Sequence, residues 1–358
     1  MKIIYYCDWF KEYTANLALA VASEAIEVTL IMRESSREFD RRRADEERLH
    51  RELMASGVEL HLIRGKYSSL ASVVSLRRMY RGKRKVGYDR FHLQQTGDPR
   101  FLWLALRMPT VLTLHEPTSR AGVVSGVDRL RDLTSGAVQH FYRRLADLIV
   151  VHTTGSLSRL TPSERLKAVV IPHGVDPLPV NSSPDSKTIL FFGRAAAYKG
   201  IDTLLAAMAK VWAAEPDARL RILASPGDVA AIPVADPRID ASWDGYSNEQ
   251  LELEIGGARV VCLPYTSASG SGVAAQAYGS GRPIVASDLE GLRELVAHKE
   301  LLANPADETD LARALITALR QDYVPRDIDP MRAWPGVAAQ HIRAYRSLAW
   351  AHDRSGSA

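Results

Sequence analysis

Cysteine is scarce in this 358-residue chain, which contains only Cys7 and Cys262. Both lie in apolar runs that predict buried strands, so we expect two reduced thiols rather than a disulfide or metal ligands. No His or Cys group has the spacing of a metal site, and no nucleophile elbow is present. The one Asp-x-Asp motif, Asp327–Asp329, lies in a proline-flanked connector and not at a strand end. The sequence therefore predicts no metal, no cofactor and no covalent nucleophile.

Long hydrophobic runs are also missing. No apolar segment approaches the roughly 20 residues of a transmembrane helix, and a strand pattern begins at Lys2 without a preceding signal segment. We therefore expect a cytoplasmic protein, with peripheral contact to the inner face of the plasma membrane left open. Hydrophobic residues still make up 46% of the chain, which is enough for two domains with cores of their own.

Charge is unevenly distributed along the chain. Residues 1–177 hold 28 Lys and Arg against 20 Asp and Glu, a net +8, whereas the rest holds 18 against 22, a net −4. The densest basic cluster comprises Arg77, Arg78, Arg81, Lys83, Arg84 and Lys85. This cluster either contacts anionic lipid headgroups or a pyrophosphate-linked lipid acceptor, or is the solvated end of a helix. Nucleic acid is not predicted as a partner, because no groove-reading or stacking motif accompanies the charge.

Strand patterns alternate with amphipathic helix patterns through most of the chain. In the first part, strand patterns at residues 2–7, 28–33 and 58–63 are separated by helix patterns. Such βαβ alternation predicts parallel sheets and an α/β fold. A Pro- and Ser-rich stretch without periodicity precedes Thr188 and predicts a linker.

The stretch from Leu263 to Gly291 predicts a strand, a loop of small residues, a helix and a second strand. The loop, Thr266–Gly272, is almost wholly Ser, Ala and Gly, so a ligand can approach its backbone closely. We expect the helix to begin near Ser271 and to end at Gly281. A helix N-terminus after such a loop presents free N–H groups that suit a phosphate. The candidate donor-binding residues are Ser269, Gly270, Ser271, Gly272 and Val273.

A second stretch, Ile189–Val211, predicts a buried strand, a turn at Gly193 and an amphipathic helix. Arg194 and Lys199 bracket the turn. Ligands of open α/β sheets bind beyond the carboxyl ends of the strands, so these two cations can clamp a diphosphate there.

Together these stretches resemble the retaining glycosyltransferases of family 4, which have the GT-B fold. GRAAAYKGIDTLLAA is similar to the Gly-Arg…Lys-Gly segment of that family, and GSGRPIVASDLEGLREL to its Gly-x-Pro segment. The resemblance implies two Rossmann-like, doubly wound parallel-sheet domains that face a central cleft. The expected division is an acceptor domain (residues 1–177), a linker (178–187), a nucleotide-sugar domain (188–330) and a last helix (331–350) that crosses back to the first domain.

The resemblance also implies an activity. It is metal-independent transfer, with retention of configuration, from a UDP- or GDP-linked sugar to a glycan, a lipid-linked or another small acceptor. Arg194, Lys199 and the amides near Ser271 would stabilise the leaving diphosphate. His115, in a TLH context, would lie against the donor sugar; the alternative is a histidine satisfied by local hydrogen bonds. The remaining candidates for ribose or sugar hydroxyls are Gln276 and Glu294.

The chain departs from the family pattern at two glutamates, whose positions fall on Ala268 and Gln276. Gln276 can still bind a ribose hydroxyl, but Ala268 cannot, so Ser269 or Ser271 would have to replace its contact. Three alternatives therefore stay open: a GT-B partner protein that has lost catalysis, a nucleotide-sugar epimerase, and a structural βαβ corner without a ligand.

The loop after the first strand, DWFKEYTAN, supplies candidates for the acceptor or the cleft. They are Asp8, Trp9, Tyr13 and Thr14. Aromatic rings in this loop, Phe10 included, either stack on an acceptor sugar or pack the wall between the domains. Relatives often carry a glycine pair in this loop, and this chain has none. Trp243, in the second domain, either stacks on the nucleobase or packs.

Overall fold

The computed structural model describes residues 1–22, 26–34, 43–63, 87–117, 126–178, 187–232, 236–268, 271–322 and 326–348. The chain forms two compact units. Unit 1 consists of residues 1–174 and 334–358, and unit 2 of residues 175–333. The basic cluster at residues 77–85 and most of the predicted linker lie outside the described residues.

Unit 1 is built on a seven-stranded sheet with the order β3-β2-β1-β4-β5-β6-β7. All of its strand pairs are parallel. The strands are β1 (Lys2–Cys7), β2 (Glu27–Arg33), β3 (Glu59–Ile63), β4 (Arg90–Gln94), β5 (Thr110–Leu114), β6 (Leu148–Val151) and β7 (Ala168–Val170). Because both faces of a parallel sheet are covered, its central strands are apolar on both sides, as the buried run of β1 shows. The predicted α/β class is confirmed.

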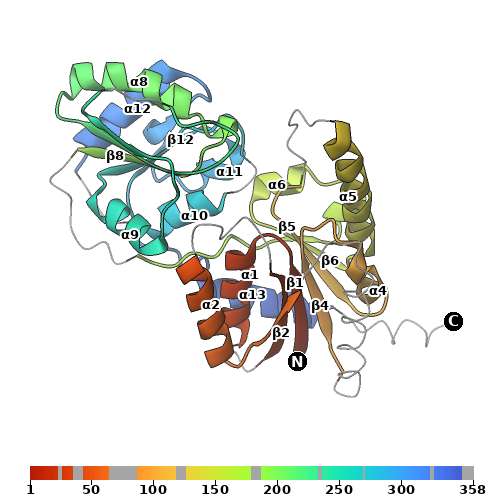
Figure 1. Ribbon diagram of the computed structural model, residues 1–358. Coiled ribbons are helices and arrows are strands. Elements are labelled where there is room, and N and C mark those ends of the chain that lie inside the picture. Colours follow the sequence, from red (N-terminus) through yellow and green to blue (C-terminus); the bar gives the residue numbers. More distant parts are fainter. Residues whose placement is uncertain are drawn as a thin grey trace. The chain divides into compact units, whose positions relative to one another are not determined.

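Helices cover both faces of this sheet (Figure 1). They are α1 (Lys11–Ala22), α2 (Arg43–Ala55), η2 (Pro99–Phe101), α4 (Leu102–Ala105), α5 (Gly126–Leu145), α6 (Thr154–Ser158), α7 (Pro162–Arg165) and α13 (Trp334–Ser347). The core on one face joins Tyr5 to α1, α2 and α13. The core on the other face joins the next residue, Tyr6, to α4 and α5. Alternation along β1 therefore feeds two cores.

Helix α13 completes unit 1, although it follows unit 2 in the sequence. Its Tyr345 hydroxyl lies 2.8 Å from the Tyr5 hydroxyl, inside the core. The Arg90 guanidinium donates through Nε to the Tyr345 carbonyl at 2.9 Å. The end of this helix is thus tied to both β1 and β4.

Unit 2 contains a six-stranded parallel sheet with the order β10-β9-β8-β11-β12-β13. The strands are β8 (Thr188–Arg194), β9 (Arg219–Ser225), β10 (Ile239–Ser242), β11 (Val260–Leu263), β12 (Ile284–Ser287) and β13 (Leu302–Ala303). The helices are η3 (Ala197–Lys199), α8 (Ile201–Ala214), α9 (Asn248–Gly257), α10 (Gly272–Gly279), α11 (Glu290–Arg293), η4 (Lys299–Leu301) and α12 (Glu308–Arg320). One core joins the sheet to α8 and α12, and the other joins it to α9 and α10.

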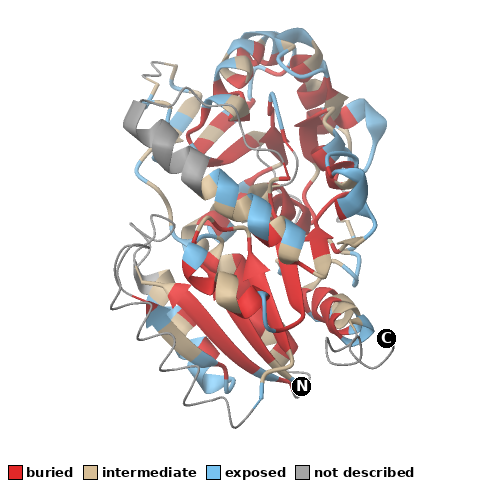
Figure 2. Cartoon of the chain, turned by 90° about the vertical axis from the view of Figure 1, so that its right-hand side faces the viewer, coloured by how far each residue is buried: buried red, intermediate tan, exposed pale blue. Residues whose placement is uncertain are grey.

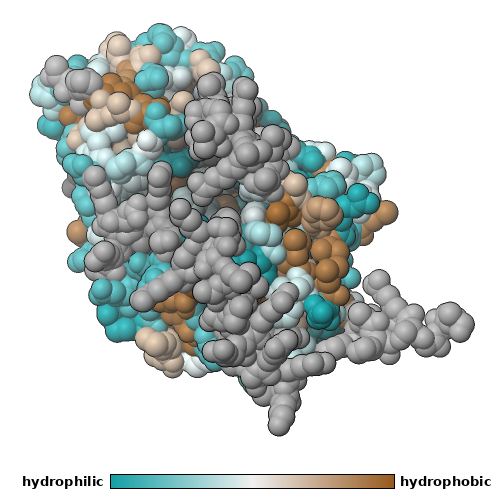
Figure 3. Space-filling model, turned by 45° about the vertical axis from the view of Figure 1, so that its right-hand side comes forward, coloured by the Kyte–Doolittle hydropathy of each residue, from teal (hydrophilic) through white to brown (hydrophobic). Residues whose placement is uncertain are grey.

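Burial follows these layers. Figure 2 shows buried strands at the centre of each unit and exposed residues on the outward sides of the helices. Cys7 and Cys262 are buried free thiols, which confirms that expectation. Some apolar side chains reach the surface, among them Leu106, Phe141 and Leu166, and brown areas mark such places in Figure 3. No helix in the described part of the chain is long and apolar enough to cross a membrane.

Both sheets have a switch point, where the order of the strands reverses. In unit 1 it lies between β1 and β4, and in unit 2 between β8 and β11. The carboxyl ends of strands at a switch point leave a crevice, because successive connections leave in opposite directions. The two stretches that the sequence singled out, after β8 and after β11, both begin at the switch point of unit 2.

Candidate functional site

The corner after β8 requires glycine at two positions. Gly193 has φ +119°, and a Cβ atom there would lie 2.4 Å from the Lys199 ammonium nitrogen. Gly200 has φ +69°, and its Cβ would lie 1.9 Å from the Pro264 carbonyl oxygen. Any side chain at Gly200 would therefore push the two corners apart, while a methyl group at Gly193 would displace the ammonium.

Direct bonds join the corner after β8 to the corner after β11. The Thr266 amide donates to the Tyr198 carbonyl at 2.7 Å. The Lys199 ammonium donates to the Tyr265 hydroxyl at 3.1 Å and lies 5.0 Å from the centre of that ring. With only 3% of its surface exposed, Lys199 is held by the protein in one place. A cation fixed in this way pays little further ordering entropy when it binds a charged group.

Helix α10 begins at the same place. Ser271 is its N-cap and accepts a hydrogen bond from the Ala274 amide at 3.3 Å, so the expected helix start is confirmed. The Val273 side chain lies 3.0 Å from where a Gly193 Cβ would be. The structure therefore brings Gly193, Lys199, Ser271 and Val273 together at one end of the unit 2 sheet.

The other predicted donor-binding residues of unit 2 have different surroundings. Arg194 is exposed at the end of β8, Gly272 is exposed at the start of α10, and Gln276 is half-buried one turn further on. Ala268 is buried in the apolar core, so its side chain packs and offers no hydrogen bond. Ser269 and Gly270 lie outside the described residues.

Glu294, just after α11, has one engaged carboxylate oxygen. Its Oε2 accepts from the Arg332 guanidinium at 2.8 Å. Its Oε1 is buried, and no group in the described ranges donates to it. Buried carboxylate oxygens are costly without a donor, so this oxygen is suited to accept a hydroxyl.

His115 follows β5 in unit 1 and is fixed on several sides. Its Nε2 lies 2.8 Å from Gln94 Oε1, and its Nδ1 lies 3.1 Å from His152 Nε2. The ring stacks on Phe10 with centroids 3.7 Å apart and an angle of 12°. Burial, reinforced by nearby histidines that include His152, lowers the pKa of His115 well below its usual value. The imidazole is therefore neutral at pH 7.

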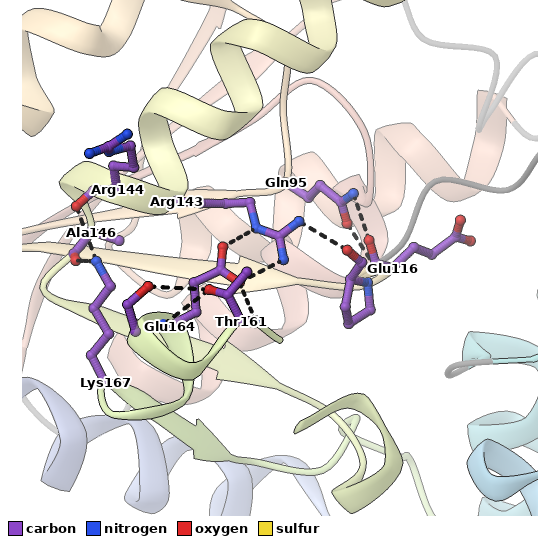
Figure 4. A network of polar contacts seen from close by, with 10 residues as sticks. Gln95, Glu116, Arg143, Arg144, Ala146, Thr161, Glu164 and Lys167 are labelled. Carbon is purple, nitrogen blue, oxygen red and sulfur yellow. Dashed lines mark hydrogen bonds and ion pairs between the residues drawn. The ribbon is translucent and has the colours of Figure 1, made fainter. Parts of the chain in front are cut away.

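The backbone of the same corner is held by the network in Figure 4. The Gln95 side chain bonds both the amide and the carbonyl of Glu116, at 2.8 and 3.0 Å. The Arg143 guanidinium donates to the Pro117 carbonyl at 2.9 Å and pairs with Glu164 at 2.7 Å. Glu164 in turn belongs to the capping box of α7. The loop that carries His115 is thus held by the side chains of Gln95 and Arg143, and Glu164 fixes the Arg143 guanidinium in turn.

The expected loop DWFKEYTAN is wrong in its second part, because α1 begins at Lys11; Tyr13 and Thr14 lie in this helix, and Asp8 and Trp9 lie in the loop before it. Tyr13 packs in the core, with its ring 4.8 Å from that of His115. The Thr14 hydroxyl, fully buried, donates to the Phe10 carbonyl at 2.6 Å. Asp8 is buried, whereas Trp9 is 41% exposed. Phe10 adopts a left-handed φ of 62°, a strained conformation for a large side chain that is fixed here by the stacking on His115.

Sequence reasoning missed three residues that surround these candidates: Gln94, His152 and Tyr265. His152 had a usable signal, because it follows β6 as His115 follows the adjacent strand β5. Tyr265 had none, since its partner Lys199 is 66 positions away in the chain. Trp243 is partly buried and packs against a core of unit 2, as the packing alternative predicts. Within the described ranges, no group of His, Cys, Asp or Glu could hold a metal ion.

Comparisons with known proteins match both units. Residues 11–177 match the family model described as Glycosyltransferase Family 4, and residues 186–321 match the model described as Glycosyl transferases group 1. A phosphatidyl-myo-inositol mannosyltransferase of Mycobacterium leprae is 28% identical over 287 residues, which cover 73% of this chain and 74% of that protein. An MMP alpha-(1->4)-mannosyltransferase of Mycolicibacterium hassiacum is 27% identical over 298 residues, covering 73% and 71%.

Solved structures show the same fold. The sucrose-phosphate synthase of Thermosynechococcus elongatus superposes with a TM-score of 0.65 at 18% identity, covering 97% of this chain and 99% of the other. The Anabaena protein HepE, solved with UDP and glucose, superposes with a TM-score of 0.62 at 15% identity, covering 97% and 95%. At these identities the likeness establishes the architecture alone.

Proposed function

Because this chain belongs to glycosyltransferase family 4 and has the GT-B fold, we propose that it transfers a sugar from a nucleoside-diphosphate sugar to a lipid-linked or glycan acceptor. The transfer retains the configuration of the donor sugar and needs no divalent metal. Family membership carries the general activity of a glycosyltransferase. The identity of the donor, the stereochemistry of transfer and the identity of the acceptor go beyond that general activity and are our proposal.

One observation supports the donor site above all others: the convergence of two βα corners in unit 2. The Lys199 ammonium packs directly against Gly193, and Val273, at the N-terminal end of α10, lies close to the same glycine. A fixed cation next to a helix N-terminus is a suitable environment for a pyrophosphate. Arg194, exposed at the end of β8, adds a second cation within reach of solvent.

The chemistry follows from this charge distribution. As the bond between the sugar and the diphosphate breaks, negative charge grows on the leaving group. Lys199, Arg194 and the first amides of α10 would stabilise that charge without moving, which lowers the barrier. In unit 1, the corner that carries His115 would bind the sugar, and the neutral ring avoids adding charge there.

The named relatives narrow the first substrates to test. Two of them are mannosyltransferases by name, and one is named for phosphatidyl-myo-inositol. We therefore take a mannosyl donor and an inositol phospholipid acceptor as the first pair. Ala268, where the family has a donor-sugar glutamate, argues for measuring other sugars in parallel.

Binding and turnover test the proposal separately. Thermal shifts of the full chain with UDP, GDP, ADP and CMP identify the nucleotide, because a ligand that binds only the folded state raises the melting temperature. Donor consumption with and without acceptors then follows. Consumption that needs an acceptor, with the α-linked product formed from an α-linked donor, is the expected result. Nucleotide binding without consumption would instead favour the non-catalytic partner, and interconversion of donors without acceptor would favour an epimerase.

Membrane contact by the basic cluster (Arg77, Arg78, Arg81, Lys83, Arg84 and Lys85) is part of the same proposal. Lysine and arginine near an anionic bilayer each contribute about 1 kcal/mol of attraction, which salt weakens. Replacing Arg81, Lys83, Arg84 and Lys85 by Gln should lower the fraction of protein that sediments with phosphatidylserine vesicles. The matched control replaces four exposed cations of unit 2, Lys210, Arg219, Arg293 and Lys299, by Gln. Binding that is indifferent to both the cluster and the salt concentration would refute the contact.

A further inference from the structure

A row of polar groups crosses the unit 1 sheet at the carboxyl ends of four adjacent strands. Gln94 ends β4, His115 follows β5, His152 follows β6, and Ile171 follows β7. Gln94 Oε1 lies 2.8 Å from His115 Nε2, His115 Nδ1 lies 3.1 Å from His152 Nε2, and His152 Nδ1 lies 3.0 Å from the Ile171 carbonyl oxygen. All three side chains are buried.

The Ile171 carbonyl sets the direction of the whole row. A carbonyl only accepts, so His152 carries its proton on Nδ1. A neutral imidazole has a single N–H, and burial keeps His152 neutral by lowering its pKa to about 3. Its Nε2 is therefore a bare acceptor, and the bond at 3.1 Å must be donated by His115 Nδ1.

The tautomer of His115 in turn fixes the orientation of the Gln94 side chain. If the neutral His115 ring donates through Nδ1, its Nε2 is bare and needs a donor. The side-chain amide of Gln94 must then turn its nitrogen, not its oxygen, toward His115. The orientation of an amide is assigned from its hydrogen bonds, and Gln94 Nε2 in the opposite orientation has no partner in the described ranges. Donation thus runs in one direction, from Gln94 through both histidines to Ile171.

We propose that His152 is a positioning residue that holds His115 in the Nδ1–H tautomer and fixes its ring plane for the donor sugar. The inference rests on the proposed function, because His115 is assigned to the sugar side of that site. With both nitrogens engaged and one face on Phe10, the ring cannot rotate without losing two hydrogen bonds. The residues next to His115 in the sequence do not select its tautomer. The acceptor for its Nδ1–H is His152, which follows the adjacent strand β6.

Two substitutions at His152 separate its two bonds. In His152→Gln the terminal oxygen takes the place of Nε2, so the acceptor for His115 is kept. In His152→Asn the amide takes the place of Nδ1, so the bond to Ile171 is kept and the acceptor for His115 is lost. We expect His152→Asn to lower kcat/KM by on the order of tenfold, and His152→Gln to lower it by about threefold at most. Affinity for the nucleoside diphosphate, which unit 2 binds, should change in neither.

A spectroscopic readout makes the test independent of turnover. Long-range ¹H–¹⁵N spectra of the full chain with ¹⁵N-labelled histidine distinguish an N–H ring nitrogen from a bare one, and His115→Gln identifies the His115 signals. The expected result is Nδ1–H in the native protein and in His152→Gln, and a shift toward Nε2–H, donated to Gln94, in His152→Asn. An unchanged Nδ1–H form in His152→Asn, or Nε2–H in the native protein, would overturn the proposal.

A second variant keeps the test decisive if His152→Asn does not fold. Gln94→Met removes the other partner of His115 but leaves the His152 acceptor, so the Nδ1–H form should persist. Its loss would show that Gln94, and not His152, selects the tautomer. If the native enzyme consumes no donor, the proposed function fails, but the spectra still show whether His152 selects the tautomer of His115. If the tautomer changes in His152→Asn of an active enzyme with kcat/KM unaffected, the positioning role fails alone.

Discussion

The corner after β8 in unit 2 is shaped mainly by glycine backbone, whereas the corner after β5 in unit 1 is shaped by buried side chains. In unit 2 the Lys199 ammonium packs against Gly193 because that residue lacks a side chain, and Gly200 lets the backbone reach Pro264. In unit 1 the space around His115 is filled by Phe10, Gln94 and other buried side chains that bond or stack on it. One corner depends on the close approach of other groups to glycines, and the other on a dense shell of polar and aromatic side chains.

This difference suits two tasks. A leaving diphosphate carries large charge and is bound by amides and a fixed cation, which need an approachable backbone. A sugar presents hydroxyls at defined angles, and a rigid wall discriminates between such groups better than a flexible one. We therefore expect the stability of unit 1 to depend on the protonation of its buried side chains. Nucleotide binding and turnover should depend on single charges and helix N-termini of unit 2.

The largest expected difference between the two units is their loss of folding stability in acid. Burial, with nearby His152 contributing, lowers the pKa of His92 to about 3, and burial likewise lowers the pKa of His152 to about 3. An unfolded histidine has a pKa of about 6.5, so the unfolded chain takes up protons first and stability falls as the pH falls below that value. At pH 5 each residue then costs about 2 kcal/mol, or about 4 kcal/mol together.

Hydrogen exchange followed by mass spectrometry can measure that loss for each unit in the intact chain. After correction for the intrinsic exchange rate, peptides from β5 and β6 should lose protection between pH 7 and pH 5, whereas peptides from β8 and β11 should retain it. Unit 2 has His298 as its single histidine. Equal loss of protection in both units would show that the histidines are not what makes unit 1 acid-sensitive.

Removing one charge should have the next largest effect. We expect Lys199→Ala to reduce kcat/KM by on the order of a hundredfold, about 2.7 kcal/mol, as for the loss of one contact to a developing charge. The matched control is Lys210→Ala on α8, whose lysine is exposed and pairs with Glu308. A rate for Lys199→Ala equal to that of the control would remove Lys199 from the proposed site.

Much of the unit 2 corner could be predicted from the sequence because its determinants are local. Gly193, Lys199 and Ser271 lie in short segments where turn, cation and helix cap follow one another within a few residues. The strand and helix pattern likewise gave the α/β class, since each element is amphipathic or apolar over its own length. A binding site made of backbone groups can be recognised in the sequence, because glycines and helix-cap residues have strong positional preferences.

The unit 1 corner could be predicted only in part, for the opposite reason. The position of His115 after a strand was visible, but its environment comes from Gln94, His152 and Phe10, which are distant in the sequence. Hydrogen bonds between adjacent strands depend on sheet order, and the order was not encoded in any one segment. The left-handed conformation of Phe10 has no sequence signal, because a large aromatic residue normally avoids it.

Loss of a helix cap should give the smallest effect and the sharpest view of the unit 2 corner. Ser271 caps α10, and Ser247 caps α9 through a bond from the Gln250 amide at 3.1 Å. Replacing either by Ala removes one N-cap, which costs about 1 kcal/mol of stability. Both variants should melt a few degrees lower, but only Ser271→Ala should weaken binding of UDP or GDP, by a few-fold, because only α10 begins at the proposed phosphate site. Titrations that show equal nucleotide affinity for the two variants would mean that the N-terminus of α10 contributes nothing to the ligand, and the chemistry of unit 2 would then depend on its cations alone.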